Sequence, residues 1–157
     1  MRADSTNPAG RPLRMAATLA LLCGLAHARA PVSIPAKMVD GRAYVQAQIN
    51  GREVTLMLDT GSAQTFVDPA AIGLSAVETA RMPHLASISA FGETSVAVAR
   101  EEVKVGKKEV TLTVVLTRTA PQQGNLPHFD GLLGVDFLSQ FKSVVVSYED
   151  KAVLLFP

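Results

Sequence analysis

The chain has 157 residues, of which 48% are hydrophobic and 18% charged, and its formal net charge is +1. This length and composition suit one compact domain with its own hydrophobic core. A nucleic-acid-binding protein needs clustered Lys and Arg, and this near-neutral chain has no basic run beyond its first few residues, so that class is disfavoured. Valine-rich bursts separated by glycine and proline, without long helical periodicity, predict a mainly β domain.

The amino terminus has the features of a secretory signal peptide. Three arginines precede the apolar stretch from Met15 to Ala28, which ends in small residues around His27. As a helix this stretch would rise about 21 Å, short of the roughly 30 Å hydrocarbon core of a membrane. We therefore expect residues 1–28 to be cleaved during export to the periplasm or the cell exterior, with an uncleaved, membrane-tethered form as the alternative. The only cysteine, Cys23, would be lost with this segment.

After this segment, residues 29–42 are predicted to be an extended leader with little to pack, and residues 43–157 a single domain. Alternating apolar residues predict strands over 43–49 and 53–58. Asn50-Gly51 between them is a strong hairpin signal. The later predictions are a strand at 65–67, a turn or brief helix at 68–72, an irregular segment at 75–84, a hairpin at 86–99, a strand-turn-strand unit at 102–116, a loop at 117–129, a strand at 131–134, a short helix at 135–141 and a hairpin at 143–156.

Asp59 ends the second strand of the first predicted hairpin and is followed by Thr60, Gly61 and Ser62. A glycine in such a loop lets backbone N–H groups approach the carboxylate closely, because it has no Cβ. Hydrogen bonds of this kind would fix the position of the carboxylate. An ordinary strand-ending turn uses the same residue types, so this short motif does not decide between chemistry and a turn.

A second motif lies well downstream, where Gly131-Leu132-Leu133-Gly134 joins a short apolar strand to the predicted helix. Its two glycines would let another backbone pass close by, and packing alone would also explain it. Neither Asp130 nor Asp136, the acidic residues on either side, belongs to a second Asp-Thr/Ser-Gly sequence. We expect turn and helix-start roles for these two.

Taken together, the two motifs resemble those of the retropepsin-like aspartic proteases, in particular the small bacterial members that carry a signal peptide. The resemblance rests on VTLMLDTGSAQTFVD (54–68) and GLLGVDFLSQF (131–141), and it extends over roughly residues 43–148. It implies an all-β fold, a closed barrel or sandwich with one short helix after the Gly-Leu-Leu-Gly strand. It also implies a flap hairpin over the active site.

The resemblance further implies an aspartic endopeptidase with Asp59 as its catalytic residue. Thr60 would brace the partner's loop across a dimer axis, and Gly61 would allow that close approach. Residues 131–134 would support the loop from behind. The flap would span residues 86–99, and the residues near its tip, over a bound peptide, would be Ala90, Phe91 and Gly92.

Only one Asp-Thr-Gly sequence is present, so the second carboxyl of such an enzyme must come from another copy of the chain. We therefore expect a homodimer acting on peptides or proteins, with either terminal strand as a candidate interface. Four apolar residues suggest mainly apolar substrate pockets: Leu56, Leu58, Val67 and Phe91. The alternative is a non-catalytic peptide-binding or assembly domain that shares the fold.

The remaining polar residues offer little support for other kinds of chemistry. His84 and His128 lie in separate predicted loops with no cysteine and no metal-ligand spacing, so we expect no metal site and no cofactor. A serine nucleophile is disfavoured because Ser62 has no histidine partner in the sequence. A Ser62 hydroxyl that donated to the Asp59 carboxylate would favour its ionised form, which predicts a more acidic pH optimum.

Overall fold

The computed structural model describes residues 30–89, 92–118 and 127–157. The predicted signal peptide therefore lies outside the described residues. The elements in chain order are β1 (Val32–Val39), β2 (Arg42–Ile49), β3 (Arg52–Leu58), β4 (Phe66–Val67), α1 (Ala76–Ala80), β5 (His84–Ser89), β6 (Gly92–Val105), β7 (Lys108–Leu116), β8 (Gly131–Leu133), α2 (Val135–Leu138), β9 (Ser143–Ser147) and β10 (Ala152–Phe156). None of the helices in these ranges is long and apolar enough to cross a membrane.

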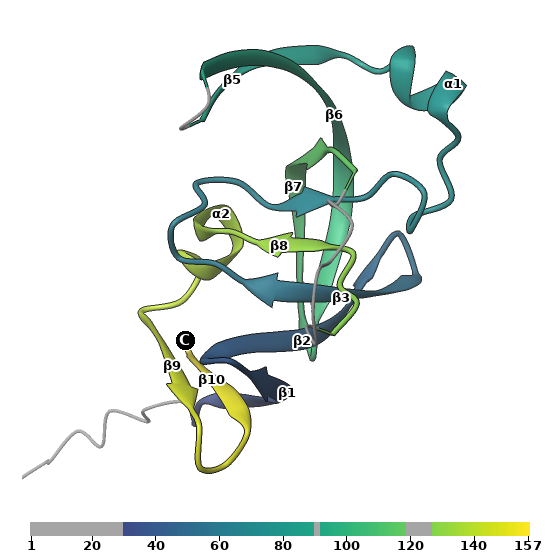
Figure 1. The fold of residues 1–157 in the computed structure, drawn as a ribbon. Coiled ribbons are helices and arrows are strands. Elements are labelled where there is room, and N and C mark those ends of the chain that lie inside the picture. Colours follow the sequence, from purple (N-terminus) through teal and green to yellow (C-terminus); the bar gives the residue numbers. More distant parts are fainter. Residues whose placement is uncertain (1–29, 90–91, 119–126) are drawn as a thin grey trace, which may run out of the picture.

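Six strands form a closed barrel, in the order β6-β7-β4-β8-β3-β2 (Figure 1). The barrel closes because β2 also pairs with β6, with Gln48 opposite Lys104 and Ile49 opposite Val103. Inward-facing side chains alternate along each strand and meet at the centre, where Phe137 of α2 fills the largest fully buried position. The predicted all-β closed barrel with a short helix after β8 is confirmed.

The predicted hairpin of β2 and β3 is also confirmed. Its turn residues, Asn50 and Gly51, have φ angles of 48° and 75°, the left-handed conformation that the favoured two-residue hairpin turn requires. The Asn50 side chain donates to the Glu101 carboxylate and accepts from the backbone N–H of Glu102 at 3.1 Å. These bonds join the turn to β6 at the point where the barrel closes.

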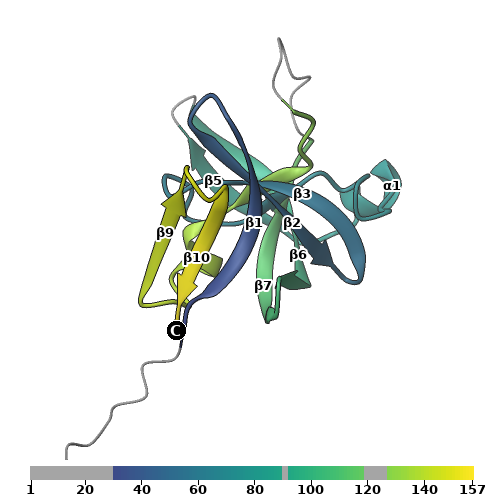
Figure 2. The same cartoon turned by 90° about the horizontal axis from the view of Figure 1, so that it is seen from below.

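The terminal strands form a three-stranded extension of the barrel sheet, in the order β1-β10-β9 (Figure 2). The expectation that the leader, residues 29–42, has little to pack is wrong for its described part, which begins at residue 30. The first half of β1 pairs with β10 and the second half with β2, and Ile34 is buried in the core with an exposed fraction of 5%. Val32, Ile34, Ala36 and Met38 alternate with the exposed Ser33, Pro35 and Lys37, so the period of a strand was present in the sequence, but one of its partners, β10, lies at the other end of the chain.

Two further elements differ from expectation. The segment 75–84, predicted to be irregular, contains α1, whose N-cap Ser75 forms a capping box with Glu78. The strand β6 runs unbroken for 14 residues, whereas the sequence predicted a hairpin ending at residue 99 and a separate strand beginning at residue 102. Glu101 lies between those two predicted elements and is buried, because the Asn50 amide supplies a hydrogen-bond donor. The helix α2 is shorter than the predicted 135–141.

Candidate active site

Asp59 lies one residue beyond the end of β3. Its backbone N–H donates to the carbonyl oxygen of Leu133 at 3.1 Å, so the parallel pairing of β3 with β8 continues to this residue. Alternation then places the Asp59 side chain on the same face as Met57, outside the barrel core. The residue is half-buried. The barrel therefore holds the backbone of Asp59 while leaving its carboxylate at the surface.

The loop after Asp59 turns back on the carboxylate. The backbone N–H of Gly61 donates to Asp59 Oδ1 at 2.9 Å, and the N–H of Ser62 donates to the Asp59 carbonyl oxygen at 3.3 Å. A Cβ at Gly61 would sit 3.2 Å from Oδ1, tighter than an ordinary contact. Thr60, at the tip, is exposed. The close approach of a glycine N–H to the carboxylate is the geometry that the sequence suggested.

The Ser62 hydroxyl has a different acceptor from the one we hypothesised. Its Oγ donates to the carbonyl oxygen of Gln64 at 2.7 Å. A hydroxyl carries a single proton, so in this arrangement it has none left to donate to Asp59. The hypothesis that Ser62 stabilises the ionised carboxylate does not hold, because the loop curls so that the Gln64 carbonyl oxygen accepts the hydrogen bond from this hydroxyl.

The strand β8 passes behind this loop at very short range. A Cβ at Gly131 would lie 2.0 Å from the carbonyl oxygen of Phe66, and one at Gly134 would lie 2.3 Å from that of Gln64. No side chain fits at either position. Between them, Leu133 points into the core with 2% exposed, and Leu132 is half-buried on the opposite face. The two glycines let the backbone after Asp59 lie directly against β8.

A buried threonine, which sequence reasoning missed, fastens the loop to α2. Thr65 is fully buried, and its N–H and Oγ1 both donate to the Asp136 carboxylate, at 2.9 and 2.7 Å. Thr65 Oγ1 also accepts from the N–H of Gly134 at 3.2 Å. Asp136 therefore has its expected helix-start position, with Phe137 N–H donating to it at 2.8 Å. Thr65 can be found from sequence only if Asp136 is known to face it.

Asp130 and the histidines have local roles. Asp130 Oδ2 accepts from the N–H of Thr55 at 2.8 Å, and Oδ1 lies 3.4 Å from His128 Nε2. His84, at the start of β5 rather than in a loop, has its Nδ1 2.8 Å from the Met82 carbonyl oxygen. Within the described ranges, no three His, Cys, Asp or Glu residues gather as a metal site would require.

This geometry can be compared with that of known proteins. The family described as gag-polyprotein putative aspartyl protease matches residues 45–140, a span that includes Asp59, the β5–β6 hairpin and α2. The chain belongs to this family. A search of the curated proteins finds no match. Among solved structures, the chain is similar to a retropepsin-like aspartic protease from Rickettsia conorii, with a TM-score of 0.57 and 23% identity over 80% of this chain and 90% of that one. The structural similarity shows a retropepsin-like fold.

In this member of the aspartyl protease family, the face of the sheet that carries Asp59 also carries a row of largely apolar side chains. Tyr44 pairs with Met57, Met57 with Leu132, and Leu132 with Phe66 across four neighbouring strands. Paired residues project to the same face of a sheet, so these four side chains form one row, which we call the floor row. Met57, Leu132 and Phe66 are half-buried.

The residues that we expected to form apolar pockets lie elsewhere. Leu56 and Val67 are fully buried in the barrel core, and Leu58 packs against that core, so none of the three belongs to the floor row. Phe91 lies outside the described residues. The error has a simple cause: Leu56 and Leu58 alternate with Met57, and the strand places its strongest apolar positions inside.

The hairpin of β5 and β6 lies at the position expected for a flap. Its outer end overhangs the side of the barrel that carries the loop after Asp59 (Figure 1). The strands pair from His84 opposite Ala97 to Ser89 opposite Gly92. Gly92 therefore begins β6 at the outer end of the hairpin, while Ala90, like Phe91, lies outside the described residues.

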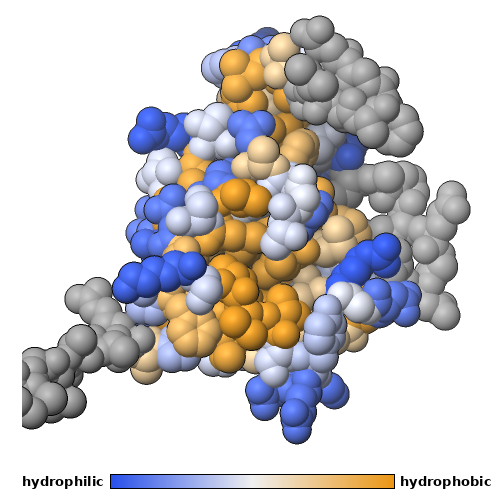
Figure 3. Space-filling view, turned by 90° about the vertical axis from the view of Figure 1, so that its left-hand side faces the viewer, coloured by the Kyte–Doolittle hydropathy of each residue, from blue (hydrophilic) through white to orange (hydrophobic). Residues whose placement is uncertain are grey.

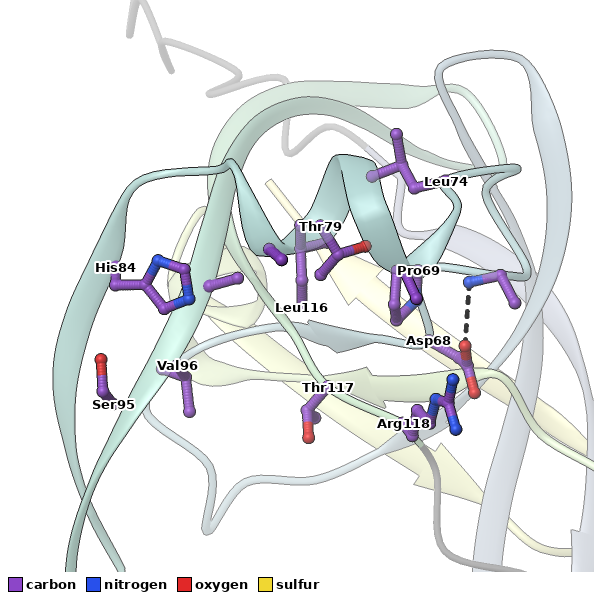
Figure 4. Close-up of a pocket in the computed structure, with 14 residues that line it drawn as sticks. Asp68, Pro69, Leu74, Thr79, His84, Ser95, Val96, Leu116, Thr117 and Arg118 are labelled. Atoms are coloured by element: carbon purple, nitrogen blue, oxygen red, sulfur yellow. Dashed lines mark hydrogen bonds between the residues drawn. The ribbon is translucent and has the colours of Figure 1, made fainter.

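A cavity of about 490 Å³ lies apart from this site (Figure 4). It lies between α1, the base of the β5–β6 hairpin and the end of β7, and Asp68, His84, Val96 and Arg118 are among its lining residues. Asp68 Oδ1 accepts from the N–H of Ala70 at 2.9 Å there. Neither the loop after Asp59 nor β8 contributes to it, so this cavity is not a cleft around the candidate catalytic carboxylate.

Proposed function

We propose that this protein is an aspartic endopeptidase in which Asp59 of two identical chains forms the catalytic pair. The observation that carries the proposal is the setting of Asp59. Its carboxylate stands at the barrel surface and is oriented by the N–H of Gly61. Its backbone is fixed to β8, and the loop after it is fixed to α2 by Thr65. Such rigid support suits a group that must meet a second carboxyl at a defined distance.

The chemistry needs two carboxyls in different protonation states. An ionised carboxylate takes a proton from a water molecule, which attacks the peptide carbonyl carbon, and a protonated carboxyl donates to the carbonyl oxygen. Two carboxyls about 3 Å apart cannot both ionise, so they share one proton. A two-fold axis beside the exposed Thr60 would bring two copies of Asp59 together without further sequence. The same pairing would complete a substrate cleft of which one chain provides only half.

The substrate of this enzyme would be an extended peptide between the β5–β6 hairpin and the floor row. Backbone hydrogen bonds to an added strand would supply affinity, and the side chains beside the scissile bond would meet the floor. Because Met57 lies on the same face as Asp59 and pairs with Leu132, and both are only half-buried, we propose a preference for apolar residues next to the cleaved bond.

The test is Asp59→Asn, which removes the titratable group with almost no change in shape. Cleavage of an unfolded protein between about pH 4 and 7 should be abolished, while folding and dimerisation persist. Asp40→Asn, in the exposed β1–β2 turn where φ is 49°, is the matched control and should remain active. Mixing wild-type chains with an excess of Asp59→Asn chains should lower the activity per wild-type chain, because mixed pairs lack one carboxyl.

Activity that survives Asp59→Asn would refute the proposal. A wild-type chain that binds peptides without any Asp59-dependent cleavage would instead establish the non-catalytic binding domain as the function. We also propose export by residues 1–28, with the mature chain in the periplasm or secreted. Amino-terminal sequencing of the mature protein should then find a start near Arg29, whereas a start within residues 1–14 would refute export.

A further inference from the structure

We propose that Asn50 is a deamidation site, and that conversion of its side-chain amide to a carboxylate weakens the seam at which β2 closes the barrel against β6. The reaction is a modification of the chain by water alone and does not depend on the proposed protease activity. It would set a limit to the lifetime of the fold, because the lost amide is not restored.

The sequence at the β2–β3 turn favours this chemistry. The backbone nitrogen of Gly51 attacks the side-chain carbonyl carbon of Asn50, so a new C–N bond closes a cyclic succinimide. The side-chain nitrogen leaves as ammonia and takes the Gly51 proton with it. Water then opens the ring at either carbonyl and leaves aspartate or isoaspartate at position 50.

The surroundings of the turn do not obstruct the two reacting groups. Glycine hinders the attack least of all residues because it has no Cβ. A Cβ built at Gly51 would meet nothing within 4 Å, and Asn50 is exposed. Water therefore has access to the site where the ring would form and open.

Hydrogen bonds to β6 oppose the attack in the folded chain. The Asn50 amide nitrogen donates to the Glu101 carboxylate, and its oxygen accepts from the Glu102 N–H at 3.1 Å. The Asn50 N–H also donates to the Glu102 carbonyl oxygen at 3.0 Å. Ring closure turns the amide and releases its nitrogen, so the side-chain bonds have to break first. We therefore expect slow deamidation in the folded chain and faster deamidation once this turn opens.

The product would place two carboxylates where the structure has a donor and an acceptor. Glu101 is only 8% exposed and receives a hydrogen bond from the Asn50 amide. An ionised aspartate at position 50 has no proton to donate, and a buried charge that loses its partner is strongly destabilising. Isoaspartate would also lengthen the backbone of the turn, between the paired residues Ile49 and Arg52.

The seam that would be weakened is short. β2 and β6 pair through Gln48 with Lys104 and through Ile49 with Val103, and the backbone bond of Asn50 prolongs this pairing by one residue. Ile49 and Val103 are fully buried, so an open seam would expose apolar core. A change at Asn50 thus acts on a large part of the contact that closes the barrel.

The turn lies at the opposite end of β3 from the candidate active site (Figure 1). The seven residues of β3 span about 23 Å, more than the roughly 10 Å beyond which salt screens exposed charges. Figure 3 faces the side of the molecule where β3 ends and shows apolar side chains gathered there. Deamidation therefore acts on the barrel and not directly on Asp59, so its tests and those of the catalytic proposal have separate outcomes.

Peptide mapping by mass spectrometry tests the reaction. The full chain is kept in mildly alkaline buffer, either folded or unfolded in urea, and the converted fraction of Asn50 is followed with time. We expect conversion to be about tenfold or more slower in the folded chain, because two side-chain hydrogen bonds must break first. Equal rates would overturn the protective role of the contacts with β6. An Asn50 that stays intact in the unfolded chain would overturn the site itself.

Asn50→Asp tests the effect of the product. Aspartate tolerates the left-handed backbone of this turn, so the variant changes the charge and keeps the local shape. Its urea midpoint should fall by about 1 M or more. Gln46→Glu, which adds the same charge at an exposed position of β2, is the matched control and should change the midpoint by less than about 0.3 M. An Asn50→Asp chain as stable as this control would overturn the proposal.

A second substitution identifies the cause. Combining Asn50→Asp with Glu101→Gln exchanges donor and acceptor, because the new amide can donate to the new carboxylate. The double variant should recover about half or more of the lost midpoint. If Asn50→Asp alone does not fold, a folded double variant supports the same conclusion. A double variant no more stable than Asn50→Asp would show that Glu101 is not the cause and would overturn the inference.

Discussion

The hydroxyl of Thr65 should contribute several kilocalories per mole to the free energy of unfolding. Thr65→Val keeps the shape of the side chain but loses the bond to Asp136 at 2.7 Å and removes the acceptor of the Gly134 N–H. A hydrogen bond to a charged group contributes about 1.5–3 kcal/mol, and a buried donor left without a partner costs about 1–3 kcal/mol. The 3.2 Å distance to Gly134 places the second term at its lower end. We therefore expect a loss of about 3 kcal/mol in the free energy of unfolding.

Urea denaturation at one fixed protein concentration measures this loss, since dimerisation would otherwise add its own concentration dependence. With a slope of about 2 kcal/mol per molar urea, the midpoint should fall by about 1.5 M. Thr65→Ser is the matched control, because it keeps the hydroxyl and gives up one methyl group worth about 0.8 kcal/mol. If Thr65→Val is no less stable than Thr65→Ser, the hydroxyl does not fasten the loop to α2 as described.

Two further outcomes can be measured directly. Because the Ser62 hydroxyl donates to Gln64 rather than to Asp59, Ser62→Ala should leave the acidic limb of the pH–rate profile unmoved, and an upward shift of that limb would contradict this. At α1, the Ser75 side chain and, to a lesser extent, its backbone N–H donate hydrogen bonds to the Glu78 carboxylate and lower the pKa of that group. The ionised carboxylate therefore stabilises the helix at pH values above the pKa of Glu78 in the unfolded chain. This stabilisation is lost as the pH falls through the lower pKa of the folded chain. Ser75→Ala should raise the pKa of Glu78 towards its ordinary value in an NMR titration, and an unchanged value would show that Ser75 is not the cause.

The parts of the fold that the sequence predicts well are those in which a local signal agrees with the tertiary structure. Asn50-Gly51 specifies its hairpin because the turn needs left-handed backbone at both residues. Gly131 and Gly134 indicate a close backbone approach because no other residue fits against the Phe66 and Gln64 carbonyl groups. These signals require no knowledge of distant partners.

Most features that the sequence did not predict depend instead on parts of the structure outside the local segment. The burial of β1 depends on β10, at the far end of the chain, and the continuity of β6 depends on Asn50 reaching Glu101. The acceptor of the Ser62 hydroxyl depends on how the loop curls. The helix α1 is a different case, since Ser75 and Glu78 were a visible capping signal. It was missed because α1 is short and buries none of its residues, so no apolar periodicity accompanied the cap.

The hydrogen bonds between Thr65 and Asp136 also affect when the site can form during synthesis of the chain. The two residues are 71 positions apart in the chain, and contacts of such long range form late in folding because a large loop must first close. A chain made from its amino terminus presents Asp59 long before β8 and α2 exist to hold it. Under the proposed mechanism, a half-synthesised chain therefore has the catalytic residue but no working site, so the chain is not an active protease while it is still being made.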